Sequence, residues 1–290
     1  MSRAEGEVYS IVDIGGGDGS LIHALRGEAG VDGRWFVVDR IQTDAPALAE
    51  AKRVSSLSEV PRGGAHLIIS NELFDAFPFA RLVQRGEDLH ELWVTEHDGA
   101  FDWTEREAPS AYSDYFASYG VELSDGQFAD VSLEWEAFYD DICAHIERGL
   151  IVTFDYGFPA AKLFHSRIRR FGTAAAYAQH RVTRDLLANP GEQDLTAHIN
   201  FSDLQRAGER RGLSTLFFDR QNKFLLALGI TEHELFTPVQ DVQLDLELRE
   251  MREEARRLVL PDGIGEEIRV LVQVKNMPRD GWSFQQELFR

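Results

Sequence analysis

The chain has 290 residues and a mass of 32.8 kDa, and its 49 Asp and Glu against 30 Lys and Arg give a net charge of −19. This acidity argues against nucleic acid as a partner, because Lys and Arg carry phosphate binding, and it also argues against an anionic membrane surface. A hydrophobic content of 43% predicts a globular protein, and the single cysteine, Cys143, excludes an internal disulfide.

Short apolar runs alternate with helical patterns over the first 70 residues. Helices are predicted over Ser20–Arg26 and Pro46–Lys52, and strands over Tyr9–Ile14, Trp35–Asp39, Arg53–Leu57 and His66–Ser70. This alternation is typical of parallel strands joined by crossover helices. The sequence therefore predicts an α/β fold.

The rest of the chain mixes hairpin, helical and strand patterns. Antiparallel hairpins are expected from Arg81–Gln84, His90–Thr95 and Ala100–Thr104, and a long irregular loop or partial helix from residues 172–200. Further helices are predicted over Leu133–Ile146, Ser202–Arg211 and Asp241–Leu260. Further strands are predicted over Gly149–Phe154, Ser214–Phe218 and Lys223–Leu228, with a last edge strand over Arg269–Lys275. We divide the chain into a domain of residues 1–230, with insertions at about 81–130 and 172–200, and a helical extension of residues 231–290.

The first motif that carries chemistry is the acid and glycine turn from Val12 to Gly19. It lacks the spacing of a dinucleotide fingerprint and the Lys-Ser/Thr of a P-loop. What remains is an acid, Asp13, before a glycine turn, the form used for S-adenosylmethionine. Asp39 ends the next strand, where it can accept hydrogen bonds from ribose hydroxyls. Each feature alone is also typical of a plain turn, but together they predict a cofactor site.

The second motif follows the strand His66–Ser70 and contains Asn71, Glu72 and Asp75. These polar side chains emerge at the same sheet edge as the glycine turn and can orient an acceptor nitrogen. The alternative interpretation is a helix start, with Asn71 as the N-cap and acids in the first turn.

The third motif runs from Pro190 to Phe201 and alternates Asp194, Thr196 and His198. On an extended segment these side chains share one face. His198 is then a base or substrate contact, and the alternative is a structural hydrogen-bonding histidine. No set of His, Cys, Asp or Glu has metal-ligand spacing, so no metal is expected.

In this order, the three motifs resemble the MidA-like family of class I S-adenosylmethionine-dependent methyltransferases. The most specific segments are Asn71–Pro78 (NELFDAFP), Phe154–Gly157 (FDYG) and Asn189–Phe201 (NPGEQDLTAHINF). The resemblance implies a Rossmann-like sheet with an antiparallel hairpin insertion and a helical C-terminal extension. It also implies methyl transfer from S-adenosyl-L-methionine to an arginine of a protein or peptide.

Carried over to matching positions, the resemblance implies two sets of site residues. The cofactor-binding set is Asp13, Gly15, Gly16, Gly17, Asp39 and Asn71. The catalytic set is Glu72, Asp75 and His198, in which a carboxylate pairs with the acceptor guanidinium.

The sequence departs from the family in lacking its usual segment before the glycine motif. We expect a second copy in a homodimer, or a partner chain, to supply that segment. A small-molecule methyltransferase and a non-catalytic assembly module remain alternatives. The absence of a signal peptide leads us to expect a cytoplasmic protein with no nucleic-acid or membrane partner.

Overall fold

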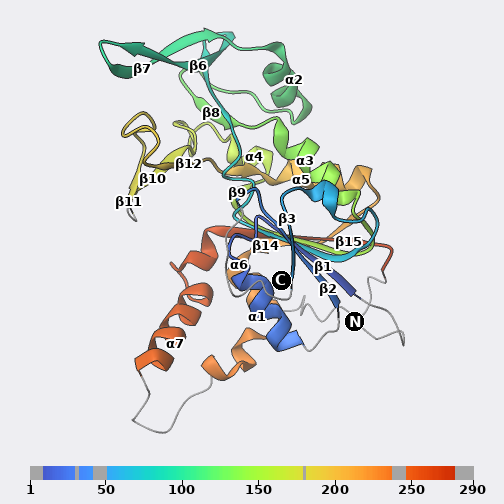
Figure 1. Cartoon of the computed structure of the whole chain (residues 1–290). Helices are drawn as coiled ribbons and strands as arrows, with labels where there is room; N and C mark the ends of the chain where they lie inside the picture. The colour runs from blue at the N-terminus through green and yellow to red at the C-terminus, as the bar shows by residue number, and fades with distance from the viewer. Residues whose placement is uncertain (1–8, 30–32, 42–50, 179–180, 237–245, 278–290) are drawn as a thin grey trace. The chain divides into compact units, whose positions relative to one another are not determined.

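The computed structural model describes residues 9–29, 33–41, 51–178, 181–236 and 246–277 (Figure 1). The chain forms two compact units, which interleave along the sequence. Unit 1 comprises Met1–Asn71, Asp141–Asp155 and Gly208–Arg290, and unit 2 comprises Glu72–Asp140 and Tyr156–Ala207. The chain therefore leaves unit 1 directly after Asn71 and directly after Asp155.

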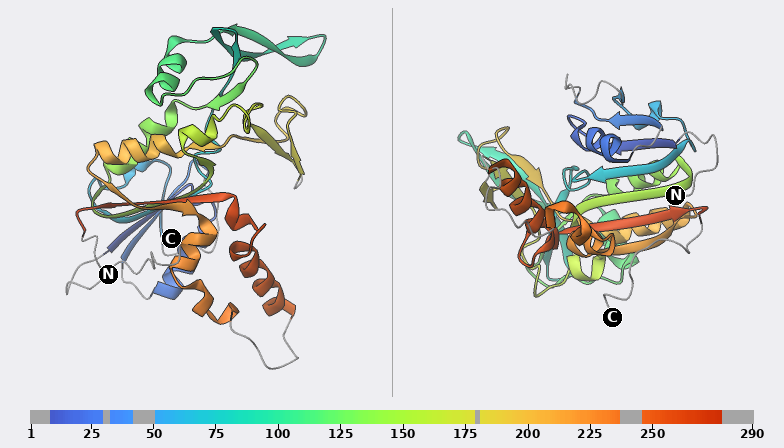
Figure 2. Two further views of the ribbon diagram at one scale, coloured as in Figure 1. Left: turned by 180° about the vertical axis from the view of Figure 1, so that it is seen from behind. Right: turned by 90° about the horizontal axis from the view of Figure 1, so that it is seen from below.

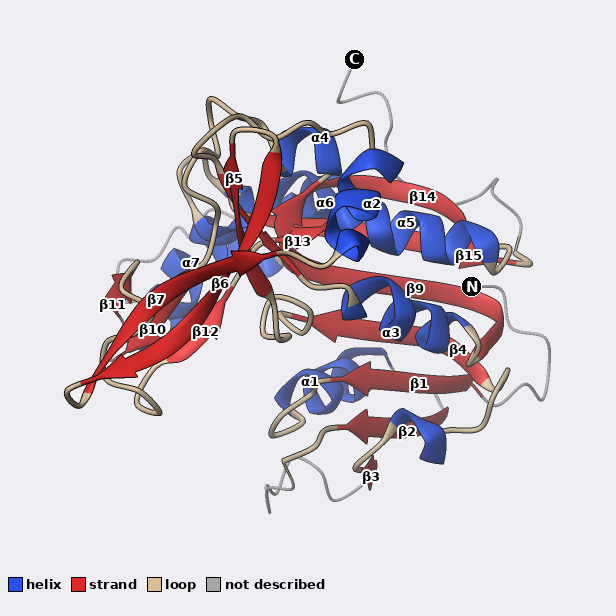
Figure 3. Cartoon of the chain, turned by 90° about the horizontal axis from the view of Figure 1, so that it is seen from above, coloured by secondary structure: helices blue, strands red, loops and turns tan. Residues whose placement is uncertain are grey.

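Unit 1 is built on a mixed sheet with the strand order β14-β15-β9-β4-β1-β2-β3. The strands β2, β1, β4 and β9 lie side by side in Figure 3, and each neighbouring pair is parallel. These strands consist mostly of buried apolar residues, because parallel strands are covered on both faces. The bounds are β1 Tyr9–Ile14, β2 Gly33–Val38, β3 Lys52–Val54, β4 Ala65–Asn71, β9 Ile146–Phe158, β14 Ser214–Arg220 and β15 Ile268–Lys275.

Helices cover this sheet through apolar side chains. Ile22 of α1 packs with Ile11, Trp35 and Val37 of the strands, and Phe224 of α6 packs against β15. In unit 1, α7 packs against α6, as Figure 2 shows. The bounds are α1 Ser20–Ala29, α6 Gln221–Ala227 and α7 Leu246–Val259, with short 3-10 turns at Leu57–Glu59, Ile230–Glu232, Glu234–Phe236 and Ile264–Glu266.

Unit 2 contains an antiparallel sheet of order β7-β6-β5-β8 and a small sheet of order β11-β10-β12. The β6–β7 hairpin turns at Asp98 and Gly99, both with positive φ, as a tight two-residue hairpin turn requires. Its strands are β5 Ala80–Arg85, β6 Asp88–His97, β7 Ala100–Glu107, β8 Phe128–Val131, β10 Ala175–Ala178, β11 Arg181–Thr183, β12 Asp194–Thr196 and β13 Ile199–Asn200, the last of which pairs with the end of β9. Its helices are α2 Ser110–Ser118 and α4 Ala160–Leu163, while α3 Glu134–Cys143 and α5 Phe201–Arg210 each run across a unit boundary.

The fold agrees with the α/β prediction and the hairpins, but it differs from the sequence analysis at several elements. The predicted strand Lys223–Leu228 is helix α6, because its Leu and Ala residues are strong helix formers and Phe224 and Ala227 bury one helical face. The predicted loop 172–200 contains the small sheet of β10, β11 and β12. Helix α2 and strand β8 had not been predicted.

The last strand, β15, was predicted at an edge of the sheet, but it lies between β14 and β9. Its polar residues find partners in neighbouring elements: Arg269 donates to the carbonyl of Glu266 in the preceding 3-10 turn at 2.7 Å, and Gln273 donates to Thr215 Oγ1 of β14 at 3.3 Å. Residues 46–50 of the predicted helix Pro46–Lys52 and residues 241–245 of Asp241–Leu260 lie outside the described residues.

Candidate functional site: a cofactor turn and an acidic loop

The glycine turn of unit 1 follows β1 at the carboxyl edge of the sheet. Gly15 has φ +76° and Gly17 has φ +52°, and glycine adopts this left-handed region without steric cost. The amide of Gly15 donates to the Val38 carbonyl at 2.8 Å, which fixes the start of the turn beside the end of β2. The turn thus lies where nucleotide-type ligands bind in doubly wound sheets.

The Asp13 carboxyl group is buried below this turn, with 1% of the residue exposed. Its Oδ2 atom has no hydrogen-bond partner among the described residues. Burial, and secondarily the charge of Asp39, raise the pKa of Asp13 to about 6. A buried oxygen without a partner is costly unless a ligand group satisfies it.

The backbone of Gly16 lies close to the Asp13 carboxyl group. A Cβ atom at Gly16 would lie 2.5 Å from Asp13 Oδ2 and 2.9 Å from Val37 Cγ1. Glycine is therefore favoured at this position by the close approach of its neighbours.

Asp39 connects the end of β2 to the turn. Its Oδ2 accepts from the Gly17 amide at 2.9 Å and its Oδ1 accepts from the Ile41 amide at 2.8 Å. Arg53 donates to the Gly17 carbonyl at 3.4 Å, a contact that sequence reasoning missed because Arg53 lies on a distant short strand. A carboxylate oxygen can accept more than one hydrogen bond, so Asp39 is a candidate to bind ribose hydroxyls.

Asn71, the last predicted cofactor residue, ends β4 at the same edge. Ser70 is opposite Ile14 in the parallel register, so Asn71 lies one position beyond the last paired residue of β1. Its side chain is exposed. The structure thus brings the predicted cofactor residues together at one edge of the sheet of unit 1, beside a buried carboxylate oxygen that can accept a hydrogen bond.

Glu72 opens unit 2 in a left-handed conformation, with φ +49°. This region costs a non-glycine residue about 1 kcal/mol or more, and such strain is concentrated at functional sites. Residues 72–79 form a turn and loop, not a helix, so the helix-start interpretation of Asn71 is wrong. The Glu72 side chain is exposed.

Asp75 is held by the third motif. Its Oδ2 accepts from Thr196 Oγ1 at 2.8 Å, and its carbonyl accepts from the Ala197 amide at 3.1 Å. The second and third motifs, 121 residues apart, therefore meet in unit 2.

His198 follows directly after this contact. Its amide donates to Thr173 Oγ1 at 3.1 Å, and its ring stacks on Tyr156, with 6.2 Å between centroids and 21° between the planes. Phe158 lies 5.7 Å from the same ring. Aromatic packing fixes the imidazole, and Tyr156 could have been predicted from its place in the Phe154–Gly157 motif.

Sequence reasoning also missed a buried polar cluster in unit 2. Tyr115 donates to Asp203 at 2.8 Å, Tyr119 also donates to Asp203, and Asn200 donates to the Tyr115 hydroxyl at 2.8 Å. Burial raises the pKa of Asp203 to about 7. Tyr115 and Tyr119 come from α2 and its C-cap, and Asn200 and Asp203 come from the end of β13 and the start of α5. Only long-range packing therefore reveals the cluster.

A parallel α/β sheet with an acid and glycine turn after its first strand, and a second acid after its neighbour, defines a nucleoside-cofactor-binding enzyme of the doubly wound class. Residues 39–218 match a protein family described as "Putative S-adenosyl-L-methionine-dependent methyltransferase". The chain belongs to this family of S-adenosyl-L-methionine-dependent methyltransferases. The predicted fold class and cofactor are thereby confirmed.

Solved structures agree with this assignment. A Burkholderia thailandensis protein bound to S-adenosyl-homocysteine superposes with a TM-score of 0.80 at 26% identity, covering 92% of this chain and 72% of that one. A native structure of a protein of the same superfamily and organism gives a TM-score of 0.82 at 25% identity, covering 96% and 77%.

Two curated relatives carry the name "Protein arginine methyltransferase NDUFAF7 homolog, mitochondrial". The Caenorhabditis elegans protein is 27% identical over 62% of this chain and 41% of its own length, and the Drosophila melanogaster protein is 30% identical over 54% and 35%. The chain therefore spans about two fifths of the length of these relatives. Because both are named as mitochondrial, the prediction of a cytoplasmic location is wrong.

Two features are absent from the described residues. No helix among them is both long enough and apolar enough to span a bilayer. Within the same residues, no group of three or more His, Cys, Asp or Glu side chains could hold a metal ion.

Proposed function

We propose that the protein transfers a methyl group from S-adenosyl-L-methionine to an arginine of a protein or peptide. The observation that carries this proposal is the exposed carboxylate of Glu72, held in a strained conformation directly after the cofactor edge of β4. The names of the two curated relatives support arginine as the acceptor.

The chain's own residues divide into two roles in this proposal. Asp13 and the glycine turn hold the cofactor, and the buried Oδ2 of Asp13 suits a cationic or hydrogen-bond-donating group. Asp39, which the Gly17 and Ile41 amides hold beside the turn, accepts hydrogen bonds from the ribose through its carboxylate. When bound, S-adenosyl-L-methionine supplies a methyl group on a sulfonium, which passes in line to a nucleophile.

The acidic loop prepares that nucleophile. A guanidinium is a weak nucleophile because its lone pairs are delocalised, and a carboxylate that accepts two of its N–H groups localises the charge and fixes the direction of attack. Glu72 takes this role. Asp75 and His198 orient the acceptor from positions fixed by Thr196 and by Tyr156. The proton leaves the methylated nitrogen to a carboxylate or to water, so no strong base is required.

The test compares Glu72→Gln with Glu122→Gln, a substitution at an exposed glutamate of unit 2. Calorimetry should show unchanged S-adenosyl-homocysteine binding in both variants. Formation of methylarginine in substrate proteins should fall at least 100-fold in Glu72→Gln alone, which is about 2.7 kcal/mol of transition-state stabilisation. Equal turnover of the two variants would remove Glu72 from the reaction.

A further inference from the structure

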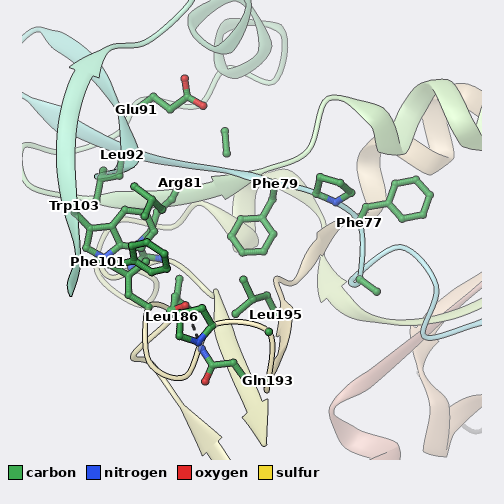
Figure 4. Close-up of a pocket in the computed structure, with 17 residues that line it drawn as sticks. Phe77, Phe79, Arg81, Glu91, Leu92, Phe101, Trp103, Leu186, Gln193 and Leu195 are labelled. Carbon is green, nitrogen blue, oxygen red and sulfur yellow. Dashed lines mark hydrogen bonds between the residues drawn. The ribbon is translucent and has the colours of Figure 1, made fainter. Parts of the chain in front are cut away.

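Unit 2 contains a pocket of about 540 Å³ with mostly apolar walls (Figure 4). Phe79 and Leu195 face Phe101 and Trp103 across it, and the buried Leu186 contributes to its lining. Phe79 and Trp103 pack against the same small core as Leu186, so the pocket is formed by packed side chains. Its volume lies in the range of ligand-binding cavities.

The pocket adjoins the residues proposed to orient the acceptor. One wall, Ala76–Arg81, begins immediately after Asp75, and another ends at Leu195, immediately before Thr196. The hydrogen bond of 2.8 Å between Thr196 and Asp75 holds these two walls together. On both segments, the residue next to the pocket lining takes part in the Asp75–Thr196 hydrogen bond. A ligand in the pocket would therefore lie close to that contact.

The β6–β7 hairpin extends the apolar wall. Val94 pairs with Trp103 and Glu96 pairs with Phe101, so these side chains share one face of the hairpin. Val94 is 50% exposed and Phe101 is 48% exposed. Trp93 points to the opposite face, where it lies 4.6 Å from the Arg106 guanidinium.

The same hairpin is strongly acidic. Residues 87–107 contain eight Asp and Glu and one Arg, a net charge of −7 with His neutral. A surface that combines exposed apolar side chains with this charge is complementary to a cationic chain with an apolar anchor. An apolar small molecule would use the pocket but not the charge.

We propose that this pocket binds a large apolar side chain of a basic polypeptide substrate, at a fixed distance along the peptide from the methylated arginine. The inference rests on the proposed function and specifies its substrate class. The pocket sets which arginine is chosen, and the acidic hairpin attracts the basic segment around it.

The test uses the full chain saturated with S-adenosyl-homocysteine and fluorescent synthetic peptides. Each peptide carries one arginine, flanking lysines, and a single leucine moved stepwise away from the arginine. At one leucine position, anisotropy should show binding about tenfold tighter than with alanine there, which corresponds to about 1.4 kcal/mol. Binding should weaken as salt is added, because the hairpin charges are exposed.

Phe101→Ala should abolish the preference for leucine, and Trp93→Ala is the matched control on the opposite face, since Trp93 is 45% exposed. Leu195→Ser changes a different wall of the pocket and should also abolish the preference for leucine. A leucine preference that survives in Phe101→Ala and Leu195→Ser, or no preference in the unmodified protein, would overturn the inference.

Methylarginine formation on the same peptides separates this inference from the proposed function. If arginine is methylated regardless of the leucine position, the proposed role of the pocket is refuted and the proposed function stands. Leucine-dependent binding without any methylarginine supports the pocket and refutes arginine as the acceptor.

Discussion

Replacing Asp13 with asparagine should stabilise the cofactor-free protein at neutral pH while weakening cofactor binding. The carboxyl group is buried below the glycine turn, and its Oδ2 has no partner among the described residues. The free protein therefore carries an electrostatic cost at the position proposed to hold the cofactor. Asparagine keeps the shape of the side chain and removes its charge.

The size of this cost follows from the pKa of Asp13, which rises from 3.8 to about 6. Because the folded state binds the proton more tightly than the unfolded state, the free energy of unfolding falls as pH rises from about 4 to 6 and is constant above that window. The raised pKa corresponds to about 3 kcal/mol at neutral pH. Asp13→Asn should gain up to about this amount at pH 7 and almost nothing at pH 4.

Urea unfolding of the wild-type protein and Asp13→Asn, measured at several pH values between 4 and 8, tests this reasoning. The difference in the free energy of unfolding should grow across the window from pH 4 to 6 and then level off. Calorimetry at pH 7 should show at least tenfold weaker S-adenosyl-homocysteine binding to the variant. A variant that is less stable than wild type at pH 7, or that binds the cofactor product equally well, would refute the assignment.

Three further substitutions test other parts of the site. Gly16→Ala should reduce S-adenosyl-homocysteine affinity at least tenfold by calorimetry, because the new Cβ would lie 2.5 Å from Asp13 Oδ2; unchanged affinity would contradict the close approach. Glu72→Gly should raise the free energy of unfolding by up to about 1 kcal/mol in urea titrations while abolishing methyl transfer, and a loss of stability would show that φ +49° is not strained. Asp203→Asn should flatten the fall in stability expected between about pH 4 and 7, since burial raises the pKa of Asp203 to about 7; an unchanged pH profile from the same titrations would assign that fall to other groups.

Local patterns predicted the strand and the glycine turn that are proposed to hold the cofactor. The strand Tyr9–Ile14 and the glycines after it follow from an apolar run and from backbone geometry, and both are encoded within a few residues. Asp39 could be placed because a parallel strand carries it to the same sheet edge as the turn. Its hydrogen bond to Gly17 could not be predicted, since side-chain rotamers depend on packing.

Features that depend on long-range contacts were missed or misjudged. The Asp75–Thr196 hydrogen bond joins residues 121 positions apart, and no spacing in either motif indicates it. β15 was expected at an edge, whereas it lies between β14 and β9, and its polar residues have partners in neighbouring elements. The segment Lys223–Leu228 lacks a clear period, and an apolar run of this length does not distinguish strand from helix.

The most direct test of the account is to follow a labelled methyl group. The protein is incubated with cellular proteins and S-adenosyl-L-methionine that carries an isotopically labelled methyl group, and tandem mass spectrometry then locates the label. The account predicts label on arginine nitrogens of protein substrates, lost when Glu72→Gln replaces the wild-type protein. Label found only in small molecules, or on arginine to the same extent with Glu72→Gln, would contradict it.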